Sequence, residues 1–177
     1  QSEPNGLGHA ILQAKHIITD DFFGIILADD LILSEPGCLK QLLEIHEKTQ
    51  SSVLGVFSAS ENQVSNYGVI SSKNIDGIEK VDGIVEKPKP ADAPSNLAVF
   101  GRYILSKDIF LNIEQTKPGL NNEIQLTDAI QDLISNQDVF ALEFEGKRFD
   151  CGSKEGYIAA IIDRTLSIDK YKSIIEK

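Results

Sequence analysis

The stretch that decides the fold class begins at residue 22 and reads Phe22-Phe23-Gly24-Ile25-Ile26-Leu27-Ala28-Asp29-Asp30. Its short, continuous apolar run ends abruptly in two acids, which is typical of a strand buried on both faces. Apolar residues spaced three and four apart predict a helix on each side of it, over residues 7–18 and 36–48, and a second apolar strand follows over residues 52–57. The order helix, strand, helix, strand predicts a parallel α/β layer.

The remainder of the chain predicts a mixed architecture. From Tyr67 to Leu105, short apolar segments alternate with Asn, Asp, Gly and Pro, a pattern that predicts antiparallel strands. Beyond them, the apolar spacing predicts helices over residues 106–113 and 126–134, a strand over 139–144 and a helix over 154–166. We therefore expect one α/β domain over residues 1–166 and a charged helical tail over residues 167–177.

The composition is that of one soluble globular unit. Of the 177 residues, 41% are hydrophobic and 25% are charged, which is enough for a substantial core. The net charge of −10 opposes the phosphates of nucleic acids and of anionic membranes, so we expect neither as a partner. No apolar run is long enough to span a membrane, and the first residues lack the features of a signal peptide. Cys38 and Cys151 lie in unrelated contexts and predict free thiols, which favours a cytoplasmic protein.

Two motifs in the first third of the chain are suited to ligand binding, and both have an ordinary alternative. The Asp29-Asp30 pair, expected at the carboxyl edge of a parallel strand, is suited to a divalent cation. Aspartate pairs are also common in turns and helix caps. The Gly6-Leu7-Gly8-His9 segment would let backbone N–H groups approach a ligand closely, but it is also the sequence of a plain turn.

Two later motifs are ambiguous in the same way. Glu86-Lys87-Pro88 places an acid and an ammonium at the end of a β segment, suited to a sugar hydroxyl and a phosphate, and it also fits a solvated charged pair. Asp150, followed by Cys151-Gly152, is suited to a second metal-facing carboxylate and also to a helix cap. No Ser or Cys comes with a convincing His and acid, which disfavours hydrolysis through a covalent intermediate.

The order of these motifs along the chain resembles that of one family, the bacterial UTP–glucose-1-phosphate uridylyltransferases within the sugar-1-phosphate nucleotidyltransferases. The similarity extends from the first residue to about Arg164. Its matching blocks are Gln1 with Gly6-Leu7-Gly8-His9-Ala10, Leu27-Ala28-Asp29-Asp30, Tyr67-Gly68-Val69-Ile70, Val85-Glu86-Lys87-Pro88-Lys89, residues 94–103, Asn122-Glu123-Ile124-Gln125-Leu126-Thr127-Asp128-Ala129 and Phe149-Asp150-Cys151-Gly152.

The resemblance implies a Rossmann-like nucleotidyltransferase fold, with a mixed central sheet flanked by helices that is incomplete at its N-terminus. It implies the Mg²⁺-dependent reaction of UTP with glucose 1-phosphate to give UDP-glucose and pyrophosphate, and a homo-oligomer. Transfer between two anions requires charge cancellation and in-line positioning more than covalent help. Mg²⁺ and a lysine would therefore supply what an acidic protein otherwise lacks.

The resemblance also assigns roles to individual residues. Asp29 and Asp150 would hold the metal, and together with Lys87, which would reach the sugar phosphate, they form the implied catalytic set. Asp30 would not bind the metal itself but would support the residues that do. The implied substrate-binding residues are Gln1, Gly6, Gly8 and His9 around the nucleotide and Tyr67, Gly68, Glu86, Lys87 and Gly101 around the sugar phosphate.

One family feature has no counterpart in the sequence. Family members carry a glycine-rich, arginine-containing loop that embraces the triphosphate, and roughly the first third of a member is not matched here. The absence of methionine also indicates a fragment or a processed chain. We expect weak UDP-glucose binding and little or no turnover from the 177 residues. The alternatives are a thymidylyl- or adenylyltransferase acting on a hexose 1-phosphate and a non-catalytic UDP-sugar-binding remnant.

Overall fold

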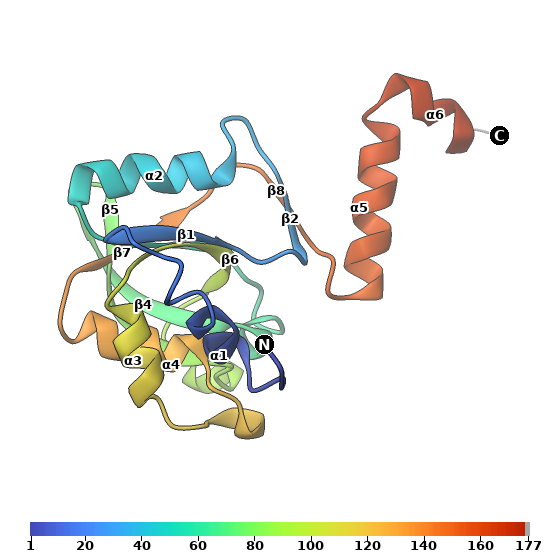
Figure 1. Cartoon of the computed structure of the whole chain (residues 1–177). Helices are drawn as coiled ribbons and strands as arrows, with labels where there is room; N and C mark the ends of the chain where they lie inside the picture. The colour runs from blue at the N-terminus through green and yellow to red at the C-terminus, as the bar shows by residue number, and fades with distance from the viewer. Residues whose placement is uncertain (176–177) are drawn as a thin grey trace.

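The computed structural model describes the backbone of residues 1–175 and the side chains of all of these except residues 120, 174 and 175. A mixed sheet lies between helices, and the last two helices project from this body (Figure 1). The elements are, in chain order, α1 (Leu7–Leu12), β1 (Phe22–Ile26), β2 (Asp30–Leu33), α2 (Cys38–Thr49), β3 (Ser52–Ser58), the 3-10 helix η1 (Val64–Asn66), β4 (Gly68–Ile75), β5 (Ile78–Glu86), η2 (Pro90–Asp92), β6 (Leu97–Ser106), α3 (Ile109–Gln115), η3 (Leu120–Asn122), α4 (Leu126–Ile134), β7 (Val139–Glu143), β8 (Lys147–Asp150), α5 (Lys154–Leu166) and α6 (Asp169–Ile175).

The central sheet has the strand order β1-β6-β3-β7-β5-β4. Strands β3 and β7 pair in parallel, whereas every other pairing recorded in this sheet is antiparallel, including a contact of Val69 in β4 with Ala98 in β6. A separate two-stranded ribbon joins β2 to β8. The mixed sheet flanked by helices confirms the α/β fold class, and the antiparallel strands expected between Tyr67 and Leu105 are present as β4, β5 and β6.

Strand β1 differs from the expectation of a buried strand in a parallel layer. Its recorded partner among the described strands is β6, which it meets antiparallel with Phe22 opposite Ser106, so β1 lies at an edge of the sheet. Ile26 is 58% exposed. Strand β3 pairs with the opposite side of β6. The prediction that this strand belongs to a parallel layer was wrong. An apolar run indicates that both faces of a strand pack against the core, but it does not indicate which strands pair with its two edges.

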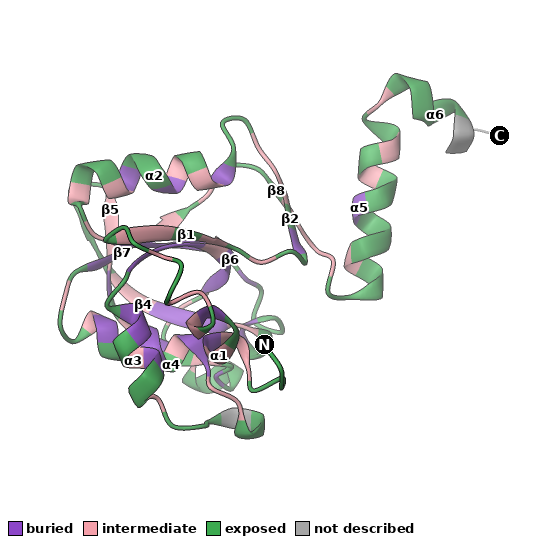
Figure 2. Cartoon of the chain, in the orientation of Figure 1, coloured by how far each residue is buried: buried purple, intermediate pink, exposed green. Residues whose placement is uncertain are grey.

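Apolar side chains form a core on each face of the central sheet. On one face, α2 packs Leu42 and Ile45 against Val53 and Phe100. The larger cluster on the other face joins α1, α3 and α4 to the sheet, with Ile130 of α4 fully buried. Burying a leucine or isoleucine side chain stabilises the fold by about 1.5–3 kcal/mol. The buried residues thus concentrate in the sheet and its covering helices, while α5 is largely exposed (Figure 2).

Several local predictions agree with the structure. Helix α4 covers residues 126–134 and α5 covers 154–166, as the apolar spacing indicates. Helix α5 begins after Ser153, whose hydroxyl accepts a hydrogen bond from the Gly156 N–H. Helix α1 is shorter than predicted, because the segment after Leu12 continues as turns. Helix α6 lies within the predicted tail, whose residues 176 and 177 are outside the described part of the chain.

The prediction of two free thiols is confirmed. Cys38 and Cys151 are both free thiols. Cys38, the first residue of α2, packs into the core, and burial raises the pKa of its thiol to about 11. Within residues 1–175, every helix is too short or too polar to cross a bilayer.

Candidate functional site

A cleft of about 360 Å³ lies where the β2–β8 ribbon meets the central sheet. Seven sequence-predicted site residues line it, and Leu7, Glu123, Thr127 and Arg148 are among their neighbours. Clefts that gather several polar groups from different elements are the usual place for ligand binding. The predicted residues in the lining are Asp29, Tyr67, Gly68, Glu86, Lys87, Gly101 and Asp150.

The carboxylates of Asp29 and Asp150 converge on one point although they are far apart in the sequence. Asp150 in β8 lies opposite Asp30 in β2, and the Cys151 N–H donates to the Asp29 carbonyl at 2.7 Å. A Cβ atom placed on Gly152 would lie 3.1 Å from Asp150 Oδ1 and 3.3 Å from Asp29 Oδ2. The ribbon register therefore brings both carboxylate oxygens to the same side of Gly152, where a side chain would intrude.

These two carboxylates fit a magnesium site that is completed by a ligand. Mg²⁺ is usually held by one or two protein carboxylates, with waters and substrate phosphates as its other ligands. Within the described residues, no group of three or more His, Cys, Asp or Glu side chains is arranged to hold a metal ion. Two carboxylates alone would leave most coordination positions of such a cation to other ligands.

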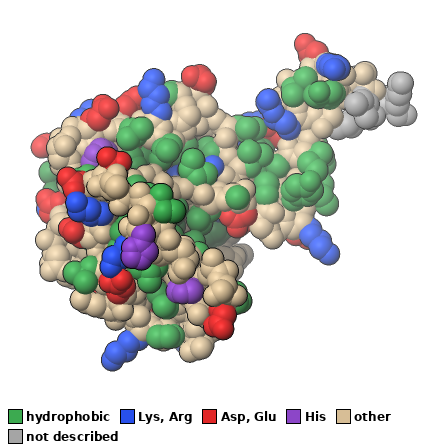
Figure 3. Space-filling model, in the orientation of Figure 1, with side chains coloured by type: hydrophobic (Ala, Val, Ile, Leu, Met, Phe, Trp, Pro, Cys, Tyr) green, Lys and Arg blue, Asp and Glu red, His purple; other side chains and the backbone are tan. Residues whose placement is uncertain are grey.

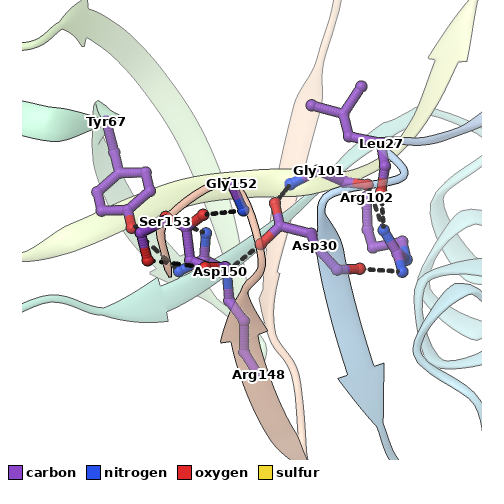
Figure 4. A network of polar contacts seen from close by, with 9 residues as sticks. All are labelled: Leu27, Asp30, Tyr67, Gly101, Arg102, Arg148, Asp150, Gly152 and Ser153. Carbon is purple, nitrogen blue, oxygen red and sulfur yellow. Dashed lines mark hydrogen bonds and ion pairs between the residues drawn. The ribbon is translucent and has the colours of Figure 1, made fainter. Parts of the chain in front are cut away.

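Asp30, next to Asp29, is buried and serves the structure of the cleft wall. Its carboxylate accepts hydrogen bonds from the Gly101 N–H at 2.7 Å and from Arg148 Nε at 2.5 Å (Figure 4). Its side chain is only 9% exposed. Burial acts to lower the pKa of Arg148, but the hydrogen bond with Tyr67 and the charge of Asp30 outweigh burial, and the net shift is upward.

Glu86 and Lys87 form the opposite side of the cleft. Thr127 Oγ1 donates to Glu86 Oε2 at 2.9 Å, and Lys87 Nζ lies 3.7 Å from Glu86 Oε1. Lys87 has a backbone φ of 44°, in the left-handed region, and its N–H donates to the Tyr67 carbonyl. Such a conformation costs a non-glycine residue about 1–3 kcal/mol and is concentrated at ligand sites. The side chain of Lys87 is 38% exposed at the cleft.

Gly68 and Gly101 lie where a side chain would not fit. A Cβ atom on Gly68 would lie 2.6 Å from Thr127 Cγ2, and one on Gly101 would lie 2.5 Å from Leu27 Cβ. The backbone of Gly101 is also fully engaged: its N–H donates to Asp30, and its carbonyl accepts from the Leu27 N–H and from Arg102. Gly101 therefore allows Leu27 and Asp30 to pack closely against the backbone, and its polar groups hold the cleft wall together.

The structure places Gln1, Gly6, Gly8 and His9 beside the cleft, outside the set of lining residues. Gln1 Nε2 lies 2.9 Å from His9 Nδ1 and donates to the Gly6 carbonyl. The Gly8 N–H donates to the Ile124 carbonyl, and Gly6, with a φ of 95°, leaves no room for a side chain against the same segment. These glycines allow α1 to approach residues 123–124 closely, and Leu7 between them reaches the cleft.

Arg148 and Thr127 are site residues that the sequence reasoning missed. Arg148 contacts Asp30 and Tyr67, and Thr127 contacts Glu86. Arg148 stands two residues before Asp150, and residues two apart in a strand share a face, but the sequence analysis predicted no strand here. Thr127 lies in the first turn of α4, inside a motif that the resemblance already included.

Comparison with known proteins identifies relatives over nearly the whole chain. The sequence model of the nucleotidyl transferase family matches residues 1–165. The chain is 48% identical over 163 residues to a UTP–glucose-1-phosphate uridylyltransferase of Pseudomonas aeruginosa, a match that covers 90% of this chain and 58% of that protein. The resemblance noted in the sequence is therefore confirmed.

Solved structures agree with the sequence comparison. A UDP-glucose pyrophosphorylase in complex with UDP-glucose superimposes with a TM-score of 0.91 at 45% identity, covering 94% of this chain and 64% of that one. A UTP-bound enzyme of the same kind from Acinetobacter baumannii gives a TM-score of 0.84 at 35% identity, covering 99% and 63%. The chain spans 58% of the length of its Pseudomonas relative. On its sequence, its fold and its motifs, the chain belongs to the nucleotidyl transferase family.

Proposed function

We propose that the cleft is the active site of a Mg²⁺-dependent uridylyltransferase that converts UTP and glucose 1-phosphate into UDP-glucose and pyrophosphate. The observation that carries this proposal is the convergence of Asp29 and Asp150 beside Gly152, in a cleft that Lys87 also lines. Similarity to a uridylyltransferase and to a structure holding UDP-glucose supports the choice of nucleotide and sugar.

In this reaction, a phosphate oxygen of glucose 1-phosphate attacks the α-phosphorus of UTP, and the bond to the pyrophosphate leaving group breaks. Asp29 and Asp150 would hold Mg²⁺, which when bound offsets the negative charge of the phosphates. Lys87, exposed at the opposite side of the cleft, would place its ammonium against the sugar phosphate. The protein has a net charge of −10, so these local cations are required for two anions to approach.

The remaining proposed contacts bind the sugar and the base. Glu86 would accept hydrogen bonds from glucose hydroxyls while Thr127 fixes one of its oxygens. Tyr67, Gly68 and Gly101 would shape the sugar pocket, because all three line the cleft. The proposed uracil contacts are those of Gln1 and Gly6, and Gly8 and His9 would shape the nucleotide pocket beside Leu7 at the edge of the cleft.

Binding measurements test this proposal directly. Calorimetric titration with UDP-glucose should give tighter binding in Mg²⁺ than in EDTA, and UDP-glucose should bind more tightly than dTDP-glucose or ADP-glucose. Asp29→Asn and Asp150→Asn should each abolish the Mg²⁺ dependence. Asp76→Asn is the matched control, since Asp76 lies in an exposed turn at a φ of 53°, which asparagine tolerates. Equal affinity with and without Mg²⁺ in the unsubstituted chain would contradict the proposal.

We further propose that the 177-residue chain turns over slowly, because its sequence contains no glycine-rich, arginine-containing loop like the one that embraces the triphosphate in the family. A pyrophosphate-release assay is the test. Turnover at the rate of a full-length relative would contradict this part of the proposal and leave the binding site intact.

Helix α5 exposes a row of large apolar side chains, including Tyr157, Ile158, Ile161 and Ile162 (Figure 3). Contiguous exposed apolar surface favours self-association, so we propose a homo-oligomer that buries α5. We also propose that residues 1–166 form the domain and that residues 167–177 are a separate tail. Size-exclusion chromatography with light scattering tests the homo-oligomer, because Ile158→Lys should shift a dimer to a monomer.

The free thiols and the negative charge favour a cytoplasmic protein without nucleic-acid or membrane partners.

A further inference from the structure

Arg148 occupies an aromatic cage that connects the β2–β8 ribbon to the central sheet. The Arg148 Cζ atom lies 4.5 Å from the ring centroid of Phe57, 4.9 Å from that of Tyr67 and 5.8 Å from that of Phe100. The Arg148 side chain is only 12% exposed. Cation–π contacts strengthen when the cation is removed from water, so this cage fixes the guanidinium within a narrow range of positions.

The charge of Arg148 is balanced mainly by Asp30. Arg148 Nε lies 2.5 Å from Asp30 Oδ1, whereas Arg148 Nη2 lies 3.8 Å from Asp150 Oδ2. Asp30 is itself held by the Gly101 N–H. Because Arg148 pairs mainly with Asp30, its guanidinium competes little with another cation for the Asp150 carboxylate.

The two oxygens of Asp150 have different surroundings (Figure 4). Oδ2 accepts a hydrogen bond from the Tyr67 hydroxyl at 2.8 Å and lies on the Arg148 side. Oδ1 lies beside Gly152, accepts from its N–H at 3.1 Å and is on the side of Asp29 Oδ2. Side chains thus hold Oδ2, whereas Oδ1 accepts a single backbone N–H and lies on the side of Asp29.

We propose that Tyr67 and Arg148 are positioning residues for Asp150, holding Oδ2 so that Oδ1 faces Asp29 for joint binding of a divalent cation. The inference rests on the proposed function, because it takes the Asp29 and Asp150 carboxylates as the cation ligands. It adds that two residues that do not contact the cation control how tightly the site binds it. Outer-shell partners of this kind typically change metal affinity by about 10-fold to 100-fold.

Tyr67→Phe tests the proposal most cleanly, because it keeps the aromatic ring in the cage and removes only the hydroxyl. The measurement is the Kd for Mn²⁺, from electron paramagnetic resonance of free and bound Mn²⁺ with the full 177-residue chain saturated with UDP-glucose. We expect the Kd to rise about tenfold while the thermal unfolding midpoint changes little. Tyr171→Phe, at an exposed tyrosine of α6, is the control. An unchanged Kd for Mn²⁺ in Tyr67→Phe would overturn the proposal.

Arg148→Lys gives an independent test, since it keeps the charge but loses the planar group that spans Asp30 and Tyr67. We expect weaker Mn²⁺ binding than in Arg164→Lys, a control on the exposed surface of α5. Asp150→Asn separates the two levels of inference. If Asp150→Asn weakens Mn²⁺ binding but Tyr67→Phe and Arg148→Lys do not, the positioning role is wrong and the metal site stands. If Asp150→Asn has no effect, the proposed metal site is itself wrong.

Discussion

The two sides of the cleft are built differently. On the ribbon side, defined here as Asp30, Tyr67, Arg148 and Asp150, the polar groups are satisfied by one another at distances down to 2.5 Å. On the sheet side, defined as Glu86 and Lys87, the ion pair is loose, with 3.7 Å between Nζ and Oε1, and the lysine is exposed. The Arg148–Asp30 pair is buried and satisfied, so it resists change, whereas the exposed charge of Lys87 is free to meet a ligand. Removing the Arg148 guanidinium on the ribbon side should therefore cost stability, whereas substitutions on the sheet side should cost binding alone.

Arg148→Ala should have the largest effect on stability. It would leave the Asp30 carboxylate, whose side chain is 9% exposed, without its closest cation. Breaking a buried pair by removing one partner costs about 3–5 kcal/mol. Urea unfolding followed by circular dichroism measures the change. Arg164→Ala on α5 is the control and should stay within about 0.5 kcal/mol. A loss below 1 kcal/mol for Arg148→Ala would show that the ribbon side is not a buried network.

Gly101→Ala should come next, because the added methyl group would lie 2.5 Å from Leu27 Cβ and 2.8 Å from Asp30 Oδ2. Forcing an extra carbon into a packed site typically costs about 1–3 kcal/mol. The same unfolding experiment measures it. An unchanged midpoint would mean that the cleft wall around Leu27 yields more readily than its contacts suggest.

Lys87→Gln should leave stability nearly unchanged and weaken UDP-glucose binding. A hydrogen bond to a charged group contributes about 1.5–3 kcal/mol, so we expect the Kd to rise about tenfold, with solvent screening keeping the effect at the lower end. Calorimetric titration measures it. Lys89→Gln, two residues further along and also exposed, is the matched control. Equal effects of the two substitutions would refute a specific role for Lys87.

The smallest effect should be seen at Cys38. Burial raises the pKa of its thiol to about 11, so less than about 1% is thiolate at pH 8 and alkylation should be slow until the pH approaches 11 or the chain unfolds. Cys151, which is partly exposed beside Asp150, should react first. Mass spectrometry after iodoacetamide treatment at pH 8 measures both. Rapid labelling of Cys38 in the folded chain would show that the core beneath α2 opens.

Helices and most strands could be read from the sequence, because their signals are local. The apolar spacing over residues 126–134 and 154–166 matches α4 and α5. Strand β1 was placed correctly in the chain but wrongly in the sheet. Which strand forms its neighbour depends on a pairing with residues 102–106, about eighty positions away, and no local pattern records such a pairing.

The residues of the candidate site likewise fall into those that local motifs indicate and those that only the folded structure reveals. The motifs selected Asp29, Glu86, Lys87 and Asp150, and the structure gathers all four in the lining of one cleft. They did not select Arg148, whose importance comes from three rings and a buried aspartate contributed by separate segments. An arginine in an exposed strand would have the same local sequence.

By itself, the sequence determined the kind of elements, the family and the acids and lysine suited to phosphate chemistry, because periodicity and residue type are properties of neighbouring positions. Only the tertiary structure decided that β1 lies at an edge, that Asp30 faces inward while Asp29 lies beside Gly152, and that Tyr67 and Arg148 hold one oxygen of Asp150. Those outcomes depend on the register of the β2–β8 ribbon and on its packing against the sheet. Such contacts join residues distant in the chain, and their energies exist only once the chain has folded.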